Sequence, residues 1–378
     1  MTAKHSDSRR ILQIGNWPPP VCSWTMSLVE LRKELEDRGW DCAVMNLNEN
    51  RRVKSQEYID VQDGWDYLKK VSRHVAQGYA VHVRVNGETR KGYFLALAAL
   101  GIARLFSRPA LLTYAGGHQQ SFFPAPRNSF RHWAFAFLFR FPHRIFCNSD
   151  KVKGAVLTTG IRQEVVVPIP HFSAQHLQFT TVPLPADLED FYRRHRAVFF
   201  AYVCLRKEYA LDFLAETIRQ FRASHPDIGF MLVGVRDREM EAMRDYITQQ
   251  GLEQGTCVMG SLPHDLFLTL LCRSLAYIRT PITDGICSSV LESLALKTPV
   301  LGSENGARPE GVERWKEGDL NSLLSLMEEA AAHPDVLRSR IPKVEVEDNA
   351  KKLADSIEEL CLKHEDRQDR FMPLESKT

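Results

Sequence analysis

The sequence lacks the cysteine patterns of zinc-binding and disulfide-stabilised proteins. Its eight cysteines are scattered, none forms a Cys-x-x-Cys pair, and no histidines stand at a spacing that suits zinc. Most of the cysteines lie in apolar segments, where a thiol packs as a small hydrophobic group. We therefore expect neither a zinc module nor a disulfide framework, and a reducing compartment such as the cytoplasm fits best.

Long hydrophobic runs are also missing. The most apolar segment, GYFLALAALGIARLF at residues 92–106, is interrupted by Arg104 and is shorter than the ~20 residues that a spanning helix needs. The first residues, MTAKHSDSRRILQIG, contain no apolar stretch of the length found in signal peptides. We expect no transmembrane segment and a cytoplasmic protein, with peripheral contact at the inner face of the cell membrane as an alternative.

Neither charge sign dominates the chain. Lysine and arginine number 49, aspartate and glutamate number 47, and the formal net charge is +2. Such a balance gives no general attraction to polyanions, so nucleic acid is not an expected partner and any basic surface must be local.

Several nucleotide-binding and catalytic motifs are absent as well. No G-x-G-x-x-G follows the first expected strand, and G-x-x-x-x-G-K-[ST] and G-x-S-x-G do not occur. No D-x-D triplet stands at the end of a strand to hold a metal–diphosphate complex. These absences argue against a nicotinamide or flavin fingerprint, a P-loop and a nucleophile elbow, and we expect no cofactor and no metal.

What the sequence does contain is a regular alternation of apolar runs and helical patterns, which predicts an α/β protein with mostly parallel sheets. The chain of 378 residues is long enough for two domains. We expect two doubly wound, Rossmann-like domains at 1–178 and 179–345, followed by a helix and tail at 346–378. The expected strands lie at residues 9–16, 40–48, 79–86, 109–117, 143–150 and 164–170, and then at 197–205, 228–235, 256–262, 275–280 and 298–304.

The alternation lapses between Thr180 and Arg196. This stretch, TTVPLPADLEDFYRRHR, contains two prolines and many charges. We interpret it as a linker between the two domains.

The stretch PITDGICSSVLESLALKTPV at residues 281–300 carries the clearest site signal. A strand is expected to end before Asp284, and a helix is expected to begin near Ser288 or Ser289. Backbone N–H groups from Ile286 to Ser289 would then form an anion-binding nest between the carboxylates of Asp284 and Glu292. The alternative, which such a pattern more often means, is that Asp284 or a serine caps the helix and Glu292 is a solvated helix residue.

The same stretch resembles the E-x7-E region of retaining glycosyltransferases of family 4, which have the GT-B fold. The resemblance rests on Pro281, Asp284-Gly285, Leu291-Glu292, Ala295 and Thr298-Pro299-Val300, and on the flanking segments VMGSLPHDLFLTLLCRSLAYI and GSENGARPEGV. It covers residues 199–312 well, whereas the N-terminal half is similar in architecture more than in motif. The resemblance implies that the two domains face each other across a cleft and that the last helix, residues 348–362, crosses back onto the first domain.

The resemblance also implies roles for particular residues. Glu292 would accept hydrogen bonds from the ribose of a nucleotide-sugar, and Asp284 would hold hydroxyls of the transferred sugar. The backbone of Gly285, Ile286, Cys287, Ser288 and Ser289 would line the sugar and its diphosphate. His118, in TYAGGHQQ, falls near the place where the family has a histidine or acid beside the reacting sugar, and its alternative is a solvent-exposed loop histidine.

This sequence departs from the family pattern at several positions. Asp284 is one methylene shorter than the usual glutamate, and Lys297 replaces a usual glycine. Arg206 and Lys207 are candidates for stabilising the leaving diphosphate, but they stand out of the usual register. They could equally be surface charges beside Glu208, and both interpretations stay open.

A further segment, RNSFRHWAFAFLFRFPHR at residues 127–144, alternates aromatic and basic residues. This composition suits a membrane headgroup interface. It also suits a buried crossover helix, because the aromatics nearly surround the helix axis, and burial is the interpretation we favour.

Taken with the resemblance, these features predict a retaining, metal-independent hexosyltransferase. Its partners would be a nucleotide-sugar donor and a glycan or lipid-linked acceptor. One alternative is a GT-B protein that binds a nucleotide or a partner without turnover. Another is an epimerase or phosphorylase of the same shape, although no pyridoxal lysine site is recognisable.

Overall fold

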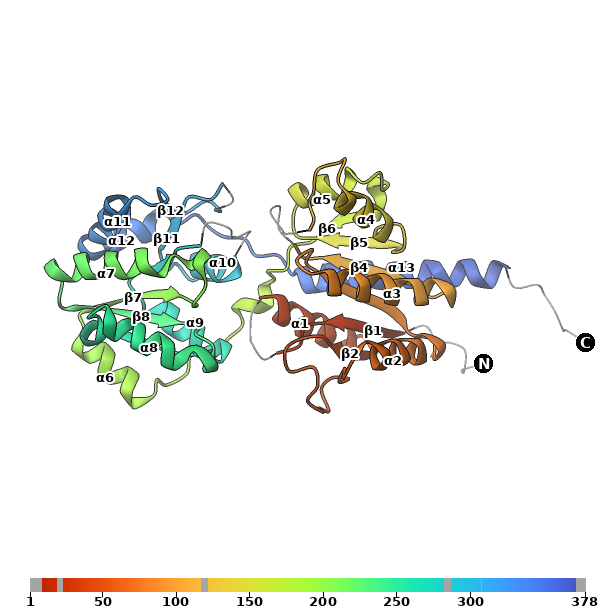
Figure 1. Ribbon diagram of the computed structural model, residues 1–378, viewed down its shortest axis with the longest axis horizontal. Coiled ribbons are helices and arrows are strands. Elements are labelled where there is room, and N and C mark those ends of the chain that lie inside the picture. Colours follow the sequence, from red (N-terminus) through yellow and green to blue (C-terminus); the bar gives the residue numbers. More distant parts are fainter. Residues whose placement is uncertain (1–8, 19–22, 117–121, 282–286, 307, 372–378) are drawn as a thin grey trace, which may run out of the picture. The chain divides into compact units, whose positions relative to one another are not determined.

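The computed structural model describes residues 9–18, 23–116, 122–281, 287–306 and 308–371, and the side chains of the last helix as far as residue 366. The chain forms two compact units. Unit 1 comprises Met1–Gln175 and Glu347–Thr378, and unit 2 comprises His176–Val346. Each unit contains one parallel sheet of six strands (Figure 1).

The sheet of unit 1 has the strand order β2-β1-β3-β4-β5-β6, and all of its paired neighbours are parallel. The order reverses between β1 and β3, since the chain first adds β2 on one side of β1 and then adds the remaining strands on the other. The strands are β1 (Arg10–Gly15), β2 (Asp41–Asn46), β3 (Ala80–Val85), β4 (Ala110–Tyr114), β5 (Arg144–Cys147) and β6 (Val166–Pro168).

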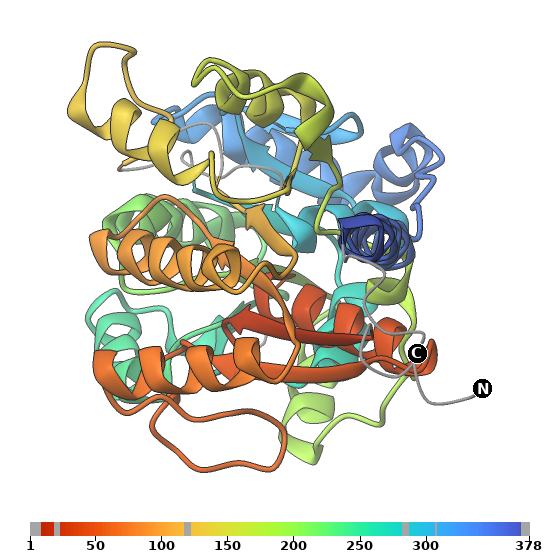
Figure 2. The same ribbon diagram turned by 90° about the vertical axis from the view of Figure 1, so that its right-hand side faces the viewer.

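Helices cover both faces of this sheet, with α2 and α3 on one face and α1 and α13 on the other (Figure 2). Side chains at Asp63, Thr89, Ser129 and Ser149 accept hydrogen bonds from first-turn N–H groups and so start four of the helices. The helices are α1 (Ser23–Asp37), α2 (Gly64–Ala76), α3 (Arg90–Leu105), α4 (Phe130–Leu138), α5 (Asp150–Leu157) and α13 (Asn349–Phe371).

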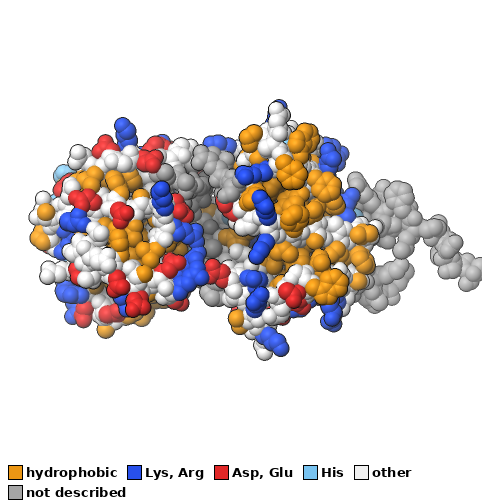
Figure 3. All heavy atoms as spheres, in the orientation of Figure 1, with side chains coloured by type: hydrophobic (Ala, Val, Ile, Leu, Met, Phe, Trp, Pro, Cys, Tyr) orange, Lys and Arg blue, Asp and Glu red, His pale blue; other side chains and the backbone are white. Residues whose placement is uncertain are grey.

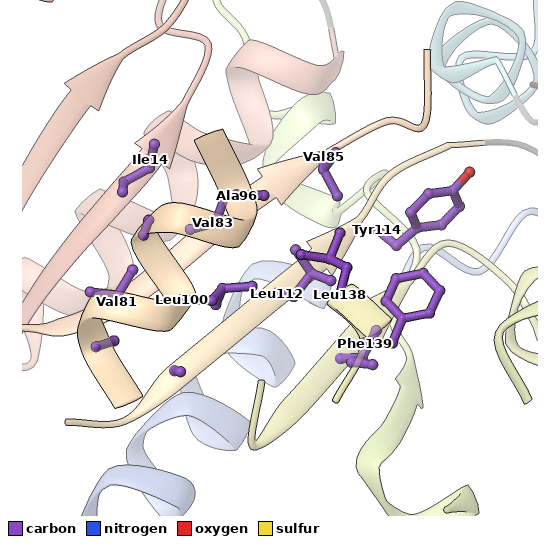
Figure 4. Close-up of a cluster of buried hydrophobic side chains, with 14 of the residues drawn as sticks. Ile14, Val81, Val83, Val85, Ala96, Leu100, Leu112, Tyr114, Leu138 and Phe139 are labelled. Atoms are coloured by element: carbon purple, nitrogen blue, oxygen red, sulfur yellow. The ribbon is translucent and has the colours of Figure 1, made fainter. Parts of the chain in front are cut away.

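Alternating strand residues divide the interior of unit 1 into two cores. Leu12 and Ile14 of β1 lie in the core that also contains buried residues of α2 and α3, whereas Ile11 lies in the core under α1 and α13. Figure 4 shows the first of these cores, where Val83 and Val85 of β3 lie among side chains of α3, β4 and α4.

The last helix, α13, completes unit 1 although the whole of unit 2 separates it in sequence. It packs beside α1, and the buried side chains of Leu353, Ala354, Ile357 and Cys361 join the core on that face. The Arg38 guanidinium at the end of α1 donates to carboxylates of α13 at Asp355 (2.7 Å) and Glu358 (3.3 Å).

The sheet of unit 2 has the order β12-β11-β10-β7-β8-β9, again with parallel pairs. Its reversal lies between β7 and β10. The strands are β7 (Ala197–Tyr202), β8 (Ile228–Val233), β9 (Thr256–Val258), β10 (Tyr277–Arg279), β11 (Val300–Ser303) and β12 (Val312–Trp315). The helices are α6 (Ala186–Arg194), α7 (Leu211–Ser224), α8 (Met240–Gln249), α9 (His264–Arg273), α10 (Ser288–Ala295), α11 (Leu320–Ala332) and α12 (Pro334–Arg340).

Part of the expected linker at residues 180–196 is a helix, and this interpretation was wrong. Pro185 precedes α6, Leu188 and Phe191 bury against the core of unit 2, and acidic residues begin the helix while basic ones end it. The charges that suggested a linker complement the helix dipole, and the apolar pair supplies the buried face.

The expected burial of the aromatic segment at residues 127–144 is also wrong for half of α4. Phe135 and Leu138 are buried, but Phe130, Trp133 and Phe137 are exposed. Because these three lie at i, i+3 and i+7, they form one outward face. None of the helices that the structure describes is long and apolar enough to cross a membrane.

Candidate functional site

The strand reversal in unit 2 defines where a ligand would bind in this unit. In open parallel sheets, ligands bind outside the carboxyl ends of the strands at the point where the strand order reverses. Here that point lies between Tyr202, the last residue of β7, and Arg279, the last residue of β10. Helices α9 and α10 begin at the same edge, so their first N–H groups lie at this end of the sheet.

Arg279 places a permanent positive charge at this edge. It is 5% exposed, and its guanidinium carbon lies 5.6 Å from the ring centroid of Tyr202 and 5.3 Å from that of Tyr209. Both distances are within the range of cation–π attraction. The Tyr277 hydroxyl accepts from Nη1 at 3.5 Å. Aromatic faces thus support the cation from within the unit.

The ring of Tyr202 can lie against Arg279 because the residue that it packs against, Gly234, has no side chain. Gly234 follows β8 with a φ of +92°, and a Cβ atom there would lie 2.4 Å from Cε2 of Tyr202. Only glycine accommodates both this backbone conformation and the ring.

Glu292 is a buried carboxylate at the same edge. It lies on the second turn of α10, is 5% exposed, and its Oε1 is 3.1 Å from Nε2 of His264. His264 is the first residue of α9, and its ring lies edge-on to that of His176 at 6.4 Å. Glu292 is therefore not a solvated helix residue, and the neighbouring imidazole holds its carboxylate in place.

Cys287, Ser288 and Ser289, at the start of α10, are half-buried. Ser289 Oγ is 2.8 Å from the Tyr277 hydroxyl and 3.1 Å from Cys287 Sγ. Cys287 occupies the N-cap position without a side-chain cap, so neither Ser288 nor Ser289 caps the helix, and Asp284, the other cap candidate, lies outside the described residues. The N–H groups of Val290 and Leu291 donate to the Cys287 carbonyl, at 3.1 and 3.2 Å, so the N–H groups of Ser288 and Ser289 are the ones that a ligand at this end of α10 would meet.

Arg206 and Lys207 follow β7 at the same end of the sheet, next to Tyr209. Both side chains are exposed, and Arg206 Nη1 lies 3.9 Å from Glu208. A surface ion pair of this length contributes ~0–1 kcal/mol to stability, so it leaves the arginine able to exchange partners. The two interpretations of this pair stay open.

The remaining predicted site residues, His118, Asp284, Gly285 and Ile286, lie outside the described residues. Pro281, just before the last three, is anchored: its carbonyl oxygen accepts from Arg308 Nη2 at 2.6 Å and from Ser303 Oγ at 3.0 Å. Arg308 is itself buried. It holds the end of the β10 segment against the end of β11.

Sequence reasoning missed His264, Arg279 and Arg308. His264 lies in the quoted segment VMGSLPHDLF, where its place at a helix start was the only signal. Arg279 ends a strand whose carboxyl end the expected topology already placed at the site, so this signal could have been used. Among the residues that the structure describes, no group of three or more His, Cys, Asp or Glu side chains gathers as a metal site would require.

Unit 1 carries a small cavity beside its own strand reversal. Arg84, the fifth residue of β3, donates to Ser27 Oγ (2.7 Å), Ser27 O (3.1 Å) and Trp24 O (3.2 Å). The cavity measures about 20 Å³, room for one water molecule and too small for a nucleotide. Its walls include Ser27, Glu30, Arg84, Thr113, Phe146, Ile169, Pro170, His171, Ser173, Asn349, Ala350 and Leu353.

The residues of the unit 2 site lie within a segment that matches a known protein family. Residues 193–321 match the family model described as glycosyl transferases group 1, a range that includes Arg279, His264 and Glu292. No curated protein sequence matches the chain.

Solved structures resemble both units together. The HepE protein of Anabaena in complex with UDP and glucose has 16% identity and a TM-score of 0.63, covering 96% of this chain and 99% of that one. Sucrose-phosphate synthase from Thermosynechococcus elongatus has 14% identity and a TM-score of 0.64, with coverage of 96% and 98%. A Listeria monocytogenes protein provisionally named a UDP-N-acetylglucosamine 2-epimerase has 13% identity and a TM-score of 0.65, with coverage of 95% and 97%. These likenesses confirm the expected fold, two Rossmann-like α/β units of the GT-B type.

Proposed function

We propose that the protein transfers a sugar from a nucleotide-sugar to a glycan or glycolipid acceptor, with retention of anomeric configuration. The observation that carries this proposal is that the buried Glu292–His264 pair and Arg279 share the sheet edge at the strand reversal of unit 2, within the residues that match the glycosyl transferase group 1 model. HepE, a protein of the same fold, binds UDP and glucose, which supports a nucleotide-sugar as the donor.

The chemistry of the site suits this reaction. The leaving nucleoside diphosphate gains negative charge in the transition state, so a catalyst must stabilise anionic oxygens. Arg279 and the first N–H groups of α10 would supply that stabilisation from unit 2, with Arg206 and Lys207 as further cations. We propose that these groups act without a metal ion.

Glu292 would recognise the ribose. An ionised carboxylate accepts hydrogen bonds only, and a ribose diol offers two hydroxyl donors. His264 would donate to Oε1 and fix the orientation of the carboxylate. His118 and Asp284 stay predictions for the transferred sugar. We expect His118→Ala to lower kcat far more than it changes the donor KM.

Thermal-shift measurements with UDP, GDP and ADP, followed by transfer and hydrolysis assays with the matching sugar nucleotides, test the proposal. We expect one nucleoside diphosphate to raise the melting temperature and its sugar derivative to turn over. Binding without turnover would instead support the nucleotide-binding alternative. Conversion of the donor to an isomer without acceptor would support an epimerase, a class that shares this fold.

A matched pair of variants tests the site itself. Glu292→Ala removes a charge-assisted hydrogen bond of about 1.5–3 kcal/mol, so nucleotide affinity should fall at least about tenfold. Glu328→Ala is the control, because Glu328 of α11 also pairs with a histidine, His225, at 2.6 Å, and is more exposed than Glu292. Equal affinity in both variants would remove Glu292 from the donor site.

The acceptor and the place of action are further parts of the proposal. A lipid-linked acceptor would bring the protein to a membrane, and we include peripheral membrane contact in the proposal. Its structural basis is a surface of unit 1.

A further inference from the structure

Acidic residues are missing from one continuous part of the chain. Residues 89–149 contain no aspartate or glutamate but eight lysines and arginines, although the whole chain is nearly neutral. Two of these cations are not fully exposed. Arg144 donates a hydrogen bond to Ser356 of α13, and Arg108 is half-buried. Six are exposed: Arg90, Lys91, Arg104, Arg127, Arg131 and Arg140.

The same part of the chain exposes large apolar side chains on α3 and α4. On α4, Phe130 is 85% exposed and Trp133 is 63% exposed, and Phe137 completes their outward face. Among the described residues, every phenylalanine that stands out as exposed lies here. We call these six residues the α3–α4 surface: Phe94, Leu105, Phe106, Phe130, Trp133 and Phe137.

The two helices form one continuous face because they pack side by side. The Tyr93 hydroxyl of α3 donates to the Ala134 carbonyl of α4 at 2.9 Å, and the ring of Tyr93 lies 5.4 Å from that of Phe135. On α3, Lys91, Phe94 and Leu105 recur at i, i+3 and i+14, so they share the outward side. Figure 3 shows hydrophobic side chains gathered over this part of unit 1, with lysine and arginine side chains beside them.

Such a surface is costly in water and calls for a partner. Exposed apolar groups rimmed by polar ones mark interaction sites. Two of the exposed cations lie over an aromatic ring of the same part of the chain: the guanidinium carbons of Arg131 and Arg90 are 5.1 and 6.0 Å from the ring centroid of Phe122. A partner that fits must therefore offer negative charge and an apolar layer behind it.

We propose that the α3–α4 surface docks onto an anionic lipid bilayer. Phe130, Trp133 and Phe137 would enter the boundary between headgroups and acyl chains, and the six exposed cations would contact the lipid phosphates. The surface is the outer side of two helices rather than a groove that could track a strand, which favours a bilayer over single-stranded nucleic acid. The inference identifies the docking surface and the lipid charge, and it does not depend on sugar transfer.

Co-sedimentation of the full chain with vesicles tests the proposal. Vesicles of equal parts phosphatidylglycerol and phosphatidylcholine should bind the protein at low salt, and vesicles of phosphatidylcholine alone should bind it at least tenfold more weakly. Added salt should weaken binding, because the headgroup attraction is screened. Failure to bind the anionic vesicles at low salt would overturn the proposal.

Two sets of variants locate the surface. Phe130→Ala with Trp133→Ala should weaken vesicle binding at least tenfold, whereas the control Trp65→Ala, on α2 of the same unit and 77% exposed, should leave it unchanged. Lys91→Glu and Arg127→Glu should each weaken binding at least about fivefold, the worth of one headgroup cation. Arg162→Glu is their control, because Arg162 is an exposed arginine that lies on neither α3 nor α4.

Other outcomes of these experiments would show whether the α3–α4 surface binds a different partner. All of the substituted side chains are exposed, so thermal unfolding should show that the variants stay folded. Equal vesicle binding by the wild type and the aromatic double variant would overturn the proposal. Tighter binding of a short single-stranded RNA than of anionic vesicles would assign the surface to nucleic acid. Concentration-dependent dimerisation that the double variant abolishes, without vesicle binding, would assign it to a second copy of the chain.

Discussion

Both units place an arginine at the carboxyl end of the strand that borders the strand reversal, and the two arginines are held differently. Arg84 of unit 1 donates three hydrogen bonds to residues of α1, and burial lowers its pKa to about 10. Arg279 of unit 2 rests against two tyrosine rings and a hydroxyl. Arg84 therefore links helix α1 to the sheet through hydrogen bonds, whereas Arg279 packs against aromatic rings. The same topological position therefore serves structure in one unit and, as we propose, ligand binding in the other.

The largest effect on the free energy of unfolding should come from replacing Arg84, the arginine of unit 1. Arg84→Ala would leave carbonyl and hydroxyl acceptors of α1 buried without their donor and would enlarge the cavity. We expect it to lower the free energy of unfolding by about 3 kcal/mol or more. Urea unfolding followed by circular dichroism measures this, with Arg73→Ala, an exposed arginine of α2, as the control. A loss below about 1 kcal/mol would show that Arg84 does not fasten α1.

The corresponding change in unit 2 should separate binding from stability. Arg279→Ala should lower the free energy of unfolding by about 2 kcal/mol, the size of a cation–π contact at a buried site, and so by less than Arg84→Ala does. It should weaken binding of the recognised nucleoside diphosphate about thirtyfold, because a charge-assisted contact to phosphate is lost. Calorimetric titration measures the affinity, and Arg314→Ala, an exposed arginine of the same unit, is the control. Unchanged affinity with a large loss of stability would make Arg279 a second structural arginine.

The free energy of unfolding should depend on pH because of a buried histidine in unit 1, His82. Burial holds the pKa of His82 well below its ordinary value, and the nearby charge of Arg84 lowers it further. The unfolded chain therefore takes up a proton below about pH 6.5 that the folded chain does not, so stability falls as the pH drops, by about 1.4 kcal/mol per pH unit. His82→Gln should remove this part of the slope, and His74→Gln should keep it. Urea unfolding between neutral and mildly acidic pH decides; an unaltered slope in His82→Gln would contradict the assignment.

The smallest effect concerns the helix that carries Glu292. Lys297 follows α10 with a φ of +60°, a conformation that favours glycine, while its Nζ donates to the carbonyls of Ile341 (3.0 Å) and Pro342 (3.1 Å). Lys297→Gly removes both strain and hydrogen bonds, so its net effect should stay within about 1 kcal/mol. Lys297→Ala loses the hydrogen bonds but keeps the strain. Thermal unfolding should rank it about 1 kcal/mol below the glycine variant, and the reverse order would show that the backbone there is not strained.

The sequence predicts the sheets well because parallel strands buried on both faces read as continuous apolar runs. The six strands expected in the first half and the five expected in the second all overlap observed strands. The strand β12 was missed because its four residues, Val312–Trp315, include two charged side chains. Periodicity also misjudged α4, since a helix with aromatics nearly all round its axis gives no sign of which side faces water.

The site was only partly predictable for a different reason. Glu292 could be found because it lies in a motif with fixed spacing from other residues. His264 and Arg279 come from separate elements, and only the folded sheet brings them to the same edge. A lone histidine or arginine has no spacing signal, so its role emerges once the strand order is known. His118 and Asp284 stay predictions.

The return of α13 to unit 1 sets the order in which the molecule can be completed during synthesis. The ribosome releases Asn349–Phe371 after every other helix and strand described here. Until then, the core that contains Ile11 of β1 and Leu31 and Leu35 of α1 lacks the side chains of α13, although the residues of unit 2 have already been synthesised. The nascent chain therefore exposes an apolar surface that can aggregate with other chains. Chaperones that act late in translation would protect this surface.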